Sequence, residues 1–281
     1  AQLQSGDWTN LLPTKNMQLA VDKNAVIANK VVPKEWENAI VDTMKWTYSM
    51  NYVSRAELSL LAILVNNNWK RPVYFTTTTP ETNYIGLDKY LVSEGFALKL
   101  MPIDRSILIA DEEEQLMNVN SIYNNIINKY TWGNLSKSKY LDPDSYRYIS
   151  LYVSGIFGET AQNLLQQGKK EEARKVVNNA YDNMPKRTLQ MSEPMSYVIL
   201  VDAMYKAGEA AKAREVSLRN LEYIKQYMKY YSSAKDQASL SNERNVRMAL
   251  IGLQRYKMLA DEYKDKDVQK VADELLNTYS Y

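Results

Sequence analysis

The spacing of apolar residues changes along the chain. Near the N-terminus Met17, Leu19 and Val21 alternate with polar residues, as in a strand that is buried on one face. From about residue 146 onward, apolar residues recur three and four positions apart, which indicates amphipathic helices. The pattern therefore predicts a small α/β segment followed by a helical region.

The helical region contains an internal repeat. The stretch QQGKKEEARK, which contains Gly168, is echoed by KAGEAAKARE, which contains Gly208. Helix pairs joined by such a turn resemble tetratricopeptide repeats, and the third pair, which lacks the glycine, suits a capping repeat. The first pair fits best, with small residues, a turn glycine and a final proline at Ala161, Gly168, Ala173, Ala180 and Pro185. The expected helices span residues 147–165, 171–184, 196–207, 209–231, 243–263 and 267–279.

The N-terminal segment mixes the two periods. An amphipathic helix is expected at residues 35–48, and Ser54 with Glu57 forms a capping box that opens a second helix ending at Val65. Because this second helix is apolar on most sides, it is predicted to be buried. The other expected elements are strands at 73–77 and 96–100 and a short helix at 86–91.

These elements define the predicted fold class. The protein is expected to be mostly α, with a small α/β segment at residues 1–104 and a tetratricopeptide-like α-α superhelix of about three helix pairs at residues 146–281. Residues 105–145 form a mixed connecting region that includes an expected helix at 118–130.

Composition excludes several chemistries. The 281 residues contain no Cys and no His, which excludes a thiolate nucleophile, a disulfide, an imidazole base and a His- or Cys-ligated zinc site. The net charge of +2 argues for neither nucleic acid nor an anionic membrane surface as a partner. The acidic run 111–114 offers the oxygen ligands that calcium takes, but it lacks the spacing and glycine of a calcium loop, so a solvated face is favoured. No cofactor, metal or catalytic residue is predicted.

The ends of the chain and its longest apolar run bear on membrane attachment. That run, residues 58–65, is far shorter than the ~20 residues needed to span a bilayer. The chain starts AQLQSGDW, with no initiator Met and no signal-peptide pattern. We expect from this start an excised or processed fragment of a longer protein.

One candidate ligand loop lies in the stretch NNNWKRPVYFTTTT, residues 66–79. Arg71 and Lys70 could hold a phosphate or sugar, Trp69 could stack on it, and Thr77 could line a polar pocket at the end of the strand. The alternative is that Trp69 covers a helix end, that the cations meet free helix carbonyls, and that the threonines reflect strand propensity. The structural alternative is favoured.

Tyrosine is the second candidate feature, because 22 Tyr accompany only 3 Phe. Rings that carry a hydroxyl suit glycan or peptide contact in the groove of a helical repeat, although they also serve packing between helices. Packing is favoured over a groove. The candidate binding tyrosines are Tyr152, close to Tyr146 and Tyr148, and Tyr223, Tyr227 and Tyr231, close to Tyr230.

Several segments resemble a known family in their order. They are VDKNAVIANKVVP, LAILVNNNWKRPVYFTTTT, GLDKYLVSEGFALKLMPI, IYNNIINKYTWGNL and YLDPD, followed by the helix pairs. The chain resembles the C-terminal region of the bacterial membrane-protein family catalogued as domain of unknown function 2723, whose members are similar to protein O-mannosyltransferases and other multi-pass glycosyltransferases that use lipid-linked sugars. The resemblance runs from about residue 16 to the end, and NNWKRPVYF and EGFALKLMP are its most specific parts.

This resemblance implies a location and a role. It implies a region on the periplasmic side of the inner membrane, attached through transmembrane helices that are absent from this chain, and it transfers no catalytic position. The expected function is that of a non-catalytic accessory region that binds acceptor protein, peptide, glycan or a partner subunit through the repeat groove. The alternative is an autonomous peptide-binding scaffold unrelated to glycosylation, and an enzyme that uses Asp, Glu, Lys or Tyr ranks third.

Overall fold

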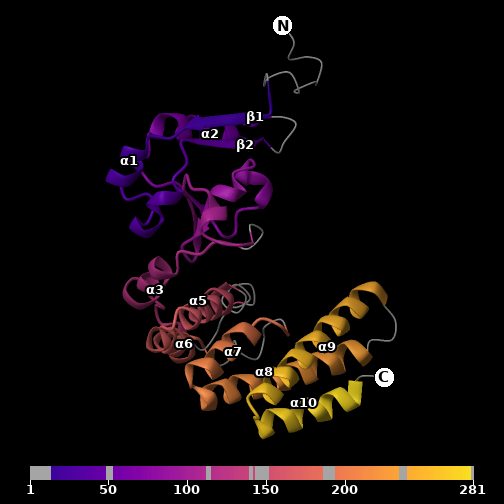
Figure 1. Cartoon of the computed structure of the whole chain (residues 1–281). Coiled ribbons are helices and arrows are strands. Elements are labelled where there is room, and N and C mark those ends of the chain that lie inside the picture. The colour runs from indigo at the N-terminus through magenta and orange to yellow at the C-terminus, as the bar shows by residue number, and fades with distance from the viewer. Residues whose placement is uncertain are drawn as a thin grey trace. The chain divides into compact units, whose positions relative to one another are not determined.

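The chain divides into two compact units, residues 1–118 and 119–281, which are described separately (Figure 1). The boundary between them lies within the stretch 105–145 that the sequence indicates as a connecting region. The predicted fold class is confirmed, because a small α/β segment is followed by packed helices in a mostly helical chain. The computed structural model describes residues 14–48, 53–111, 115–138, 142, 152–185, 194–233 and 239–279.

Two small antiparallel sheets organise the first unit. Strand β1 (Asn16–Ala20) pairs with β2 (Thr43–Thr47), so that Asn16 lies opposite Thr47. The second sheet has the order β3-β5-β4, and both of its pairings are antiparallel. Its strands are β3 (Tyr74–Thr76), β4 (Leu91–Ser93) and β5 (Ala97–Leu100). Buried aliphatic and aromatic side chains from both sheets and from the turns between them form one core.

Two helices predicted in this unit are wrong. At residues 35–48 the structure has a 3-10 helix, Lys34–Ala39, followed by strand β2. Met44 and Trp46 are buried and alternate with exposed neighbours, so cross-strand pairing with β1 decides the conformation. The short helix expected at 86–91 is also absent, because Gly86 adopts a left-handed φ of 87° and is followed by a 3-10 turn and β4.

Helix α2 (Arg55–Asn67) begins where the capping box predicts, but its predicted burial is wrong. The carboxylate of Glu57 accepts a hydrogen bond from the Ser54 amide, and Ser54 Oγ accepts from the first turn of the helix. Leu58, Ile63 and Val65 are 59%, 53% and 69% exposed. The core of the unit is filled by side chains from the strands and turns, so α2 covers it with one side and exposes an apolar face.

The second unit consists of helices that pack in sequence order. Each helix from α5 to α10 packs against the next helix in the chain. Some helices also pack against the next but one, as α5 does against α7. Figure 1 shows these helices stacked from magenta through orange to yellow. Their bounds are α3 (Val119–Asn128), α5 (Ser154–Gln166), α6 (Lys170–Asn183), α7 (Val198–Ala207), α8 (Ala210–Ser233), α9 (Ser239–Glu262) and α10 (Lys266–Tyr279), with a 3-10 turn at Leu135–Lys137.

The turns inside the three helix pairs share one geometry. Gly168, Gly208 and Lys264 have left-handed φ values of 75°, 90° and 55°. In each turn the left-handed residue donates its amide three positions back, and the next residue donates five positions back, as Asp265 does to the Ala260 carbonyl at 2.9 Å. This pattern closes the C-terminus of the first helix of each pair. The repeat seen in the sequence therefore extends to the third pair, where lysine replaces glycine.

Candidate functional site

The predicted binding residues at 69–71 separate into a buried ring and two exposed cations. Trp69 is 6% exposed and belongs to the hydrophobic core of its unit, whereas Lys70 and Arg71 are exposed. The main chain here is held by Asn67, whose side chain donates to the Arg71 carbonyl at 2.6 Å and accepts from the Arg71 amide at 3.0 Å. The tryptophan packs, and the cations face solvent.

Thr77 follows strand β3, and its amide and hydroxyl both lie 3.4 Å from the carbonyl oxygen of Phe96. The Thr76 hydroxyl lies 3.0 Å from the hydroxyls of Thr78 and Thr79, so these threonines bond to one another. Open parallel sheets bind ligands at the carboxyl ends of their strands, but this sheet is antiparallel. A ligand contact at Thr77 therefore stays a prediction, and the sheet lacks the parallel arrangement that would favour it.

Three of the predicted tyrosines form one cluster on α8, here called the tyrosine ladder: Tyr223, Tyr227 and Tyr231. Their ring centroids are separated by 5.7 Å and 4.5 Å, and all three are half-buried. Tyr230, which is 68% exposed, meets the last ring edge-on at 5.0 Å.

Tyr152 is half-buried and lies just before α5, so it is not part of the ladder. Tyr146, Tyr148 and residues 112–114 of the acidic run lie outside the described residues.

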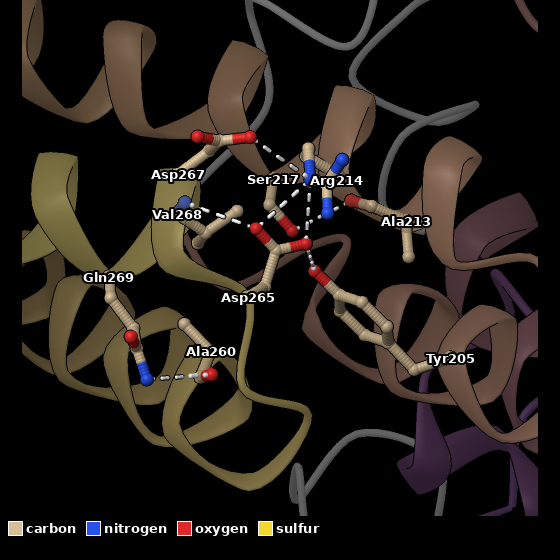
Figure 2. A network of polar contacts seen from close by, with 9 residues as sticks. All are labelled: Tyr205, Ala213, Arg214, Ser217, Ala260, Asp265, Asp267, Val268 and Gln269. Atoms are coloured by element: carbon tan, nitrogen blue, oxygen red, sulfur yellow. Dashed lines mark hydrogen bonds and ion pairs between the residues drawn. The ribbon is translucent and has the colours of Figure 1, made fainter.

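A buried carboxylate, Asp265, joins three helices of the second unit (Figure 2). Both of its oxygens accept from Arg214 Nε on α8, at 3.0 Å and 2.9 Å. Oδ2 also accepts from the Tyr205 hydroxyl on α7 at 3.0 Å, and Oδ1 accepts from the Val268 amide in the first turn of α10 at 3.3 Å. The side chain is 2% exposed. It therefore caps α10 and ties that helix to α7 and α8.

The contact between an arginine and the acidic residue of a helix–helix turn occurs twice in the repeats. Arg174 occupies the position in the first pair that Arg214 occupies in the second. Arg174 Nε lies 3.0 Å from the carboxylate of Glu209, which directly follows the turn glycine Gly208, just as Asp265 follows Lys264. Each arginine therefore reaches forward from the second helix of one pair to the turn of the next pair.

A second carboxylate, Asp202 on α7, accepts hydrogen bonds from α5, from α7 itself and from the turn after α9. It accepts hydrogen bonds from Gln162 of α5 at 2.7 Å, from Lys206 at 2.7 Å, and from the Tyr263 hydroxyl at 2.7 Å. The ring of Tyr263 stacks on that of Tyr205, with centroids 4.5 Å apart and planes inclined by 10°. The two tyrosine–carboxylate pairs thus form one continuous network between the repeats.

These contacts raise the pKa of the tyrosine hydroxyls. The hydrogen bond that Tyr181 donates to Glu215, together with burial, raises the pKa of Tyr181 to about 12. Burial, followed by the bond to Asp265, raises the pKa of Tyr205, and burial with the bond to Asp202 does the same for Tyr263. A group that transfers protons works best with a pKa near the working pH, so the raised pKa values suit these hydroxyls to structural hydrogen bonding.

The helical unit should unfold as the pH rises above 10. A phenol whose pKa is higher in the folded state than its ordinary value of 10.0 stabilises the fold fully below pH 10, and this contribution is lost as the pH rises through the folded pKa. Circular dichroism measures the loss of helix, and tyrosinate absorbance measures the ionisation of the tyrosines. As the pH rises from about 9 to about 12.5, the helix signal should fall over the same pH range in which the tyrosines with raised pKa values ionise.

The matched variant is Tyr181→Phe, which removes one shifted phenol. Its stability should fall less steeply with pH between about 10 and 12 than that of the parent protein. Equal slopes for the two proteins would contradict the assignment of the raised pKa to Tyr181.

The first unit contains a cleft of about 600 Å³ beside the β1–β2 sheet. Two strands and the turn around Gly86 form its walls. The lining combines two cations with amide, hydroxyl and apolar groups and includes no carboxylate: Asn16, Met17, Gln18, Lys45, Trp46, Thr47, Gly86 and Lys89. The volume lies in the range of small-molecule sites.

Within the described ranges, no group of three or more Asp and Glu residues is arranged to hold a metal ion. In the part of the chain that the structure describes, no helix has both the length and the apolar character to cross a bilayer.

Sequence reasoning missed the cleft and both buried carboxylates. The local pattern predicts a helix at Lys45, and Lys89 lies 44 positions farther along, so no local pattern joins them. Asp265 has a signal in the sequence, because the repeated Ala-Arg dipeptides ending at Arg174 and Arg214 mark the arginines that contact an acidic residue in the next turn, whereas Asp202 has none.

Comparison with known families relates one part of the chain to a described domain. Residues 1–121 match the family profile of TMEM260-associated domain 2. The matched range includes the cleft, helix α2 and both small sheets. No curated protein and no solved structure shows a significant match to the chain. The N-terminal unit is therefore similar to TMEM260-associated domain 2.

Proposed function

We propose that this chain is a non-catalytic accessory region of a membrane-bound glycosyltransferase-like protein on the periplasmic side of the inner membrane. In this role it binds an acceptor protein, a glycan or a partner subunit. Two likenesses support the link to a membrane-bound protein. They are the resemblance to the domain of unknown function 2723 family and the match of residues 1–121 to TMEM260-associated domain 2. The observation that carries the binding role is the tyrosine ladder on α8.

The ladder offers a ligand a row of partly accessible aromatic faces. Tyr223, Tyr227 and Tyr231 lie four residues apart, so one helix aligns all three rings along its side. Each ring combines an apolar face with a hydroxyl, and such groups contact sugars and peptides with little loss of side-chain entropy. The helix that carries them follows the turn at Gly208, whose sequence resembles that of a tetratricopeptide repeat, and repeats of that type bind partners along an extended surface.

The exposed face of α2 supports contact with another apolar surface. Leu58, Ile63 and Val65 lie within 8 residues of one another on a helix whose contacts with its own core are made from the other side. Leu58 and Val65 lie on the same side of the helix, and exposed apolar side chains that gather in this way mark interaction sites. We assign this face to the transmembrane portion of the same polypeptide.

The binding role predicts a specific mutant effect. Replacing Tyr227 and Tyr231 by leucine keeps apolar volume but removes the aromatic faces, so affinity for an oligosaccharide or glycopeptide should fall by roughly three- to tenfold for each ring. Calorimetric titration of the intact chain with an oligosaccharide panel and with a matched set of glycosylated and unmodified peptides measures this effect. Circular dichroism confirms that the variant is folded.

Two controls separate binding from packing. Lys225→Ala changes an exposed residue of the same helix and should leave affinity unchanged, and Tyr227→Phe keeps the ring and should retain most of the affinity. A folded leucine double variant that binds as tightly as the parent would show that the ladder only packs. Equal affinity for unmodified and glycosylated peptides would favour the autonomous peptide-binding scaffold.

A further inference from the structure

We propose that the cleft of the N-terminal unit, lined by Lys45 and Lys89, binds the phosphate ester of a small polyol. This site lies in a different unit from the tyrosine ladder and is independent of the function proposed for it. The two lysines and the polar groups that line the cleft with them support this assignment.

A single buried residue, Tyr90, positions both lysines. Its hydroxyl accepts from the Lys45 amide at 2.8 Å and donates to the Lys45 carbonyl at 3.2 Å. The ammonium of Lys89 lies over the Tyr90 ring, 5.2 Å from its centroid. Because Tyr90 is 5% exposed, the strand that carries one cation and the turn that carries the other are both held to the core. Tyr90 thus holds the main chain of Lys45 and the side chain of Lys89 on the same side of the core.

The turn that carries Lys89 can approach the sheet only because residue 86 is glycine. A Cβ on Gly86 would lie 2.1 Å from the carbonyl oxygen of Thr47 on strand β2, and its φ of 87° is unfavourable for other residues. The main chain of the turn therefore packs directly against the edge of the sheet. This close approach forms the wall of the cleft.

The polar groups of the cleft come from one side of the β1–β2 sheet. In the antiparallel register Asn16 lies opposite Thr47 and Gln18 lies opposite Lys45, and all four are exposed. Amide and hydroxyl groups in this arrangement donate to and accept from the hydroxyls of a polyol. The two ammonium groups nearby suit the phosphate, which takes several charge-assisted hydrogen bonds.

Trp46 adds an apolar group to the lining of the cleft. Its side chain is 8% exposed, and its Cδ1 lies 3.4 Å from the position of a Cβ on Gly86, so the indole packs against the turn. The indole N–H signal of this ring is therefore a reporter for ligand binding beside the turn.

The experiment titrates the full chain with defined probes. Inorganic phosphate, glycerol 3-phosphate, glycerol, and vesicles of phosphatidylcholine with or without phosphatidylglycerol are followed by calorimetry and by the indole N–H signals in the NMR spectrum. We expect glycerol 3-phosphate or the phosphatidylglycerol vesicles to bind, and glycerol and neutral vesicles not to bind. Binding of the soluble ester indicates a free ligand, and binding of the anionic vesicles alone indicates a lipid headgroup.

Three variants test whether the cleft is responsible. Lys45→Ala and Lys89→Ala should each weaken binding about tenfold, and their exposed positions leave folding intact. Lys34→Ala, which removes an exposed cation outside the lining, should bind as the parent does. Binding that is equally reduced by all three substitutions, or by none of them, would overturn the site, as would the absence of binding by every phosphate probe.

Discussion

Gly158→Ala should destabilise the helical unit by about 1–3 kcal/mol, although the substitution adds only one methyl group. A Cβ at this position would lie 2.8 Å from the amide nitrogen of Leu200 and 3.0 Å from the carbonyl carbon of Ile199, both in the main chain of α7. Backbone atoms cannot move aside by rotating, so α5 and α7 must separate. Thermal unfolding should show a midpoint that is lower by roughly 3–10 °C.

The same helix provides a matched control. Gly155 lies three positions earlier on α5, and a Cβ there would have no atom within 4 Å. Gly155→Ala should therefore stabilise the unit by about 0.5–1 kcal/mol, because alanine loses less backbone entropy than glycine in a helix. Opposite signs for the two substitutions are the expected outcome. A Gly158→Ala protein at least as stable as the parent would show that α5 and α7 do not meet at Gly158.

Asp265→Ala has the second large expected effect, a loss of about 2–4 kcal/mol. The substitution removes the acceptor of the Tyr205 hydroxyl, which is buried, and it removes the side chain that accepts from the first turn of α10. It also leaves Arg214 without its closest carboxylate. Chemical denaturation followed by circular dichroism measures the change in the free energy of unfolding.

Asp267→Ala is the control for charge alone. Its carboxylate lies 3.5 Å from Arg214 Nε, but the side chain is 68% exposed. Exposed ion pairs contribute little, so the expected change is about 0–1 kcal/mol. Arg214→Lys adds a second comparison, because lysine keeps the charge but loses the planar contact with both oxygens. Equal losses for the two aspartates would mean that the buried network does not join the helices.

The recurrence of the arginine contact explains how the helix pairs stay in register. Arg174 reaches Glu209, and Arg214 reaches Asp265, so the second helix of one pair is tied to the turn of the next. In repeat proteins stability depends on such contacts between neighbouring units. The contact at Asp265 is the more buried of the two, which is why we expect the larger effect there.

The sequence alone was sufficient for most of the helical unit. Helix ends are specified by residues within about four positions of one another, through periodicity, turn glycines and caps. The glycines at 168 and 208 accordingly mark turns in the structure, and the helices from α6 to α10 begin and end close to the expected positions, whereas the expected start of the first helix at residue 147 lies outside the described residues. The capping box at Ser54 likewise marks the start of α2.

Only the tertiary structure decided what is buried and what lies together. Met44 and Trp46 became strand residues because β1, some 27 positions earlier, pairs with them. The face of α2 stayed exposed because other segments filled the core. The cleft exists because Tyr90 bonds to the main chain of Lys45, 45 positions away. Contacts of this kind join residues that are distant in sequence, so they cannot be predicted from the local spacing of residues.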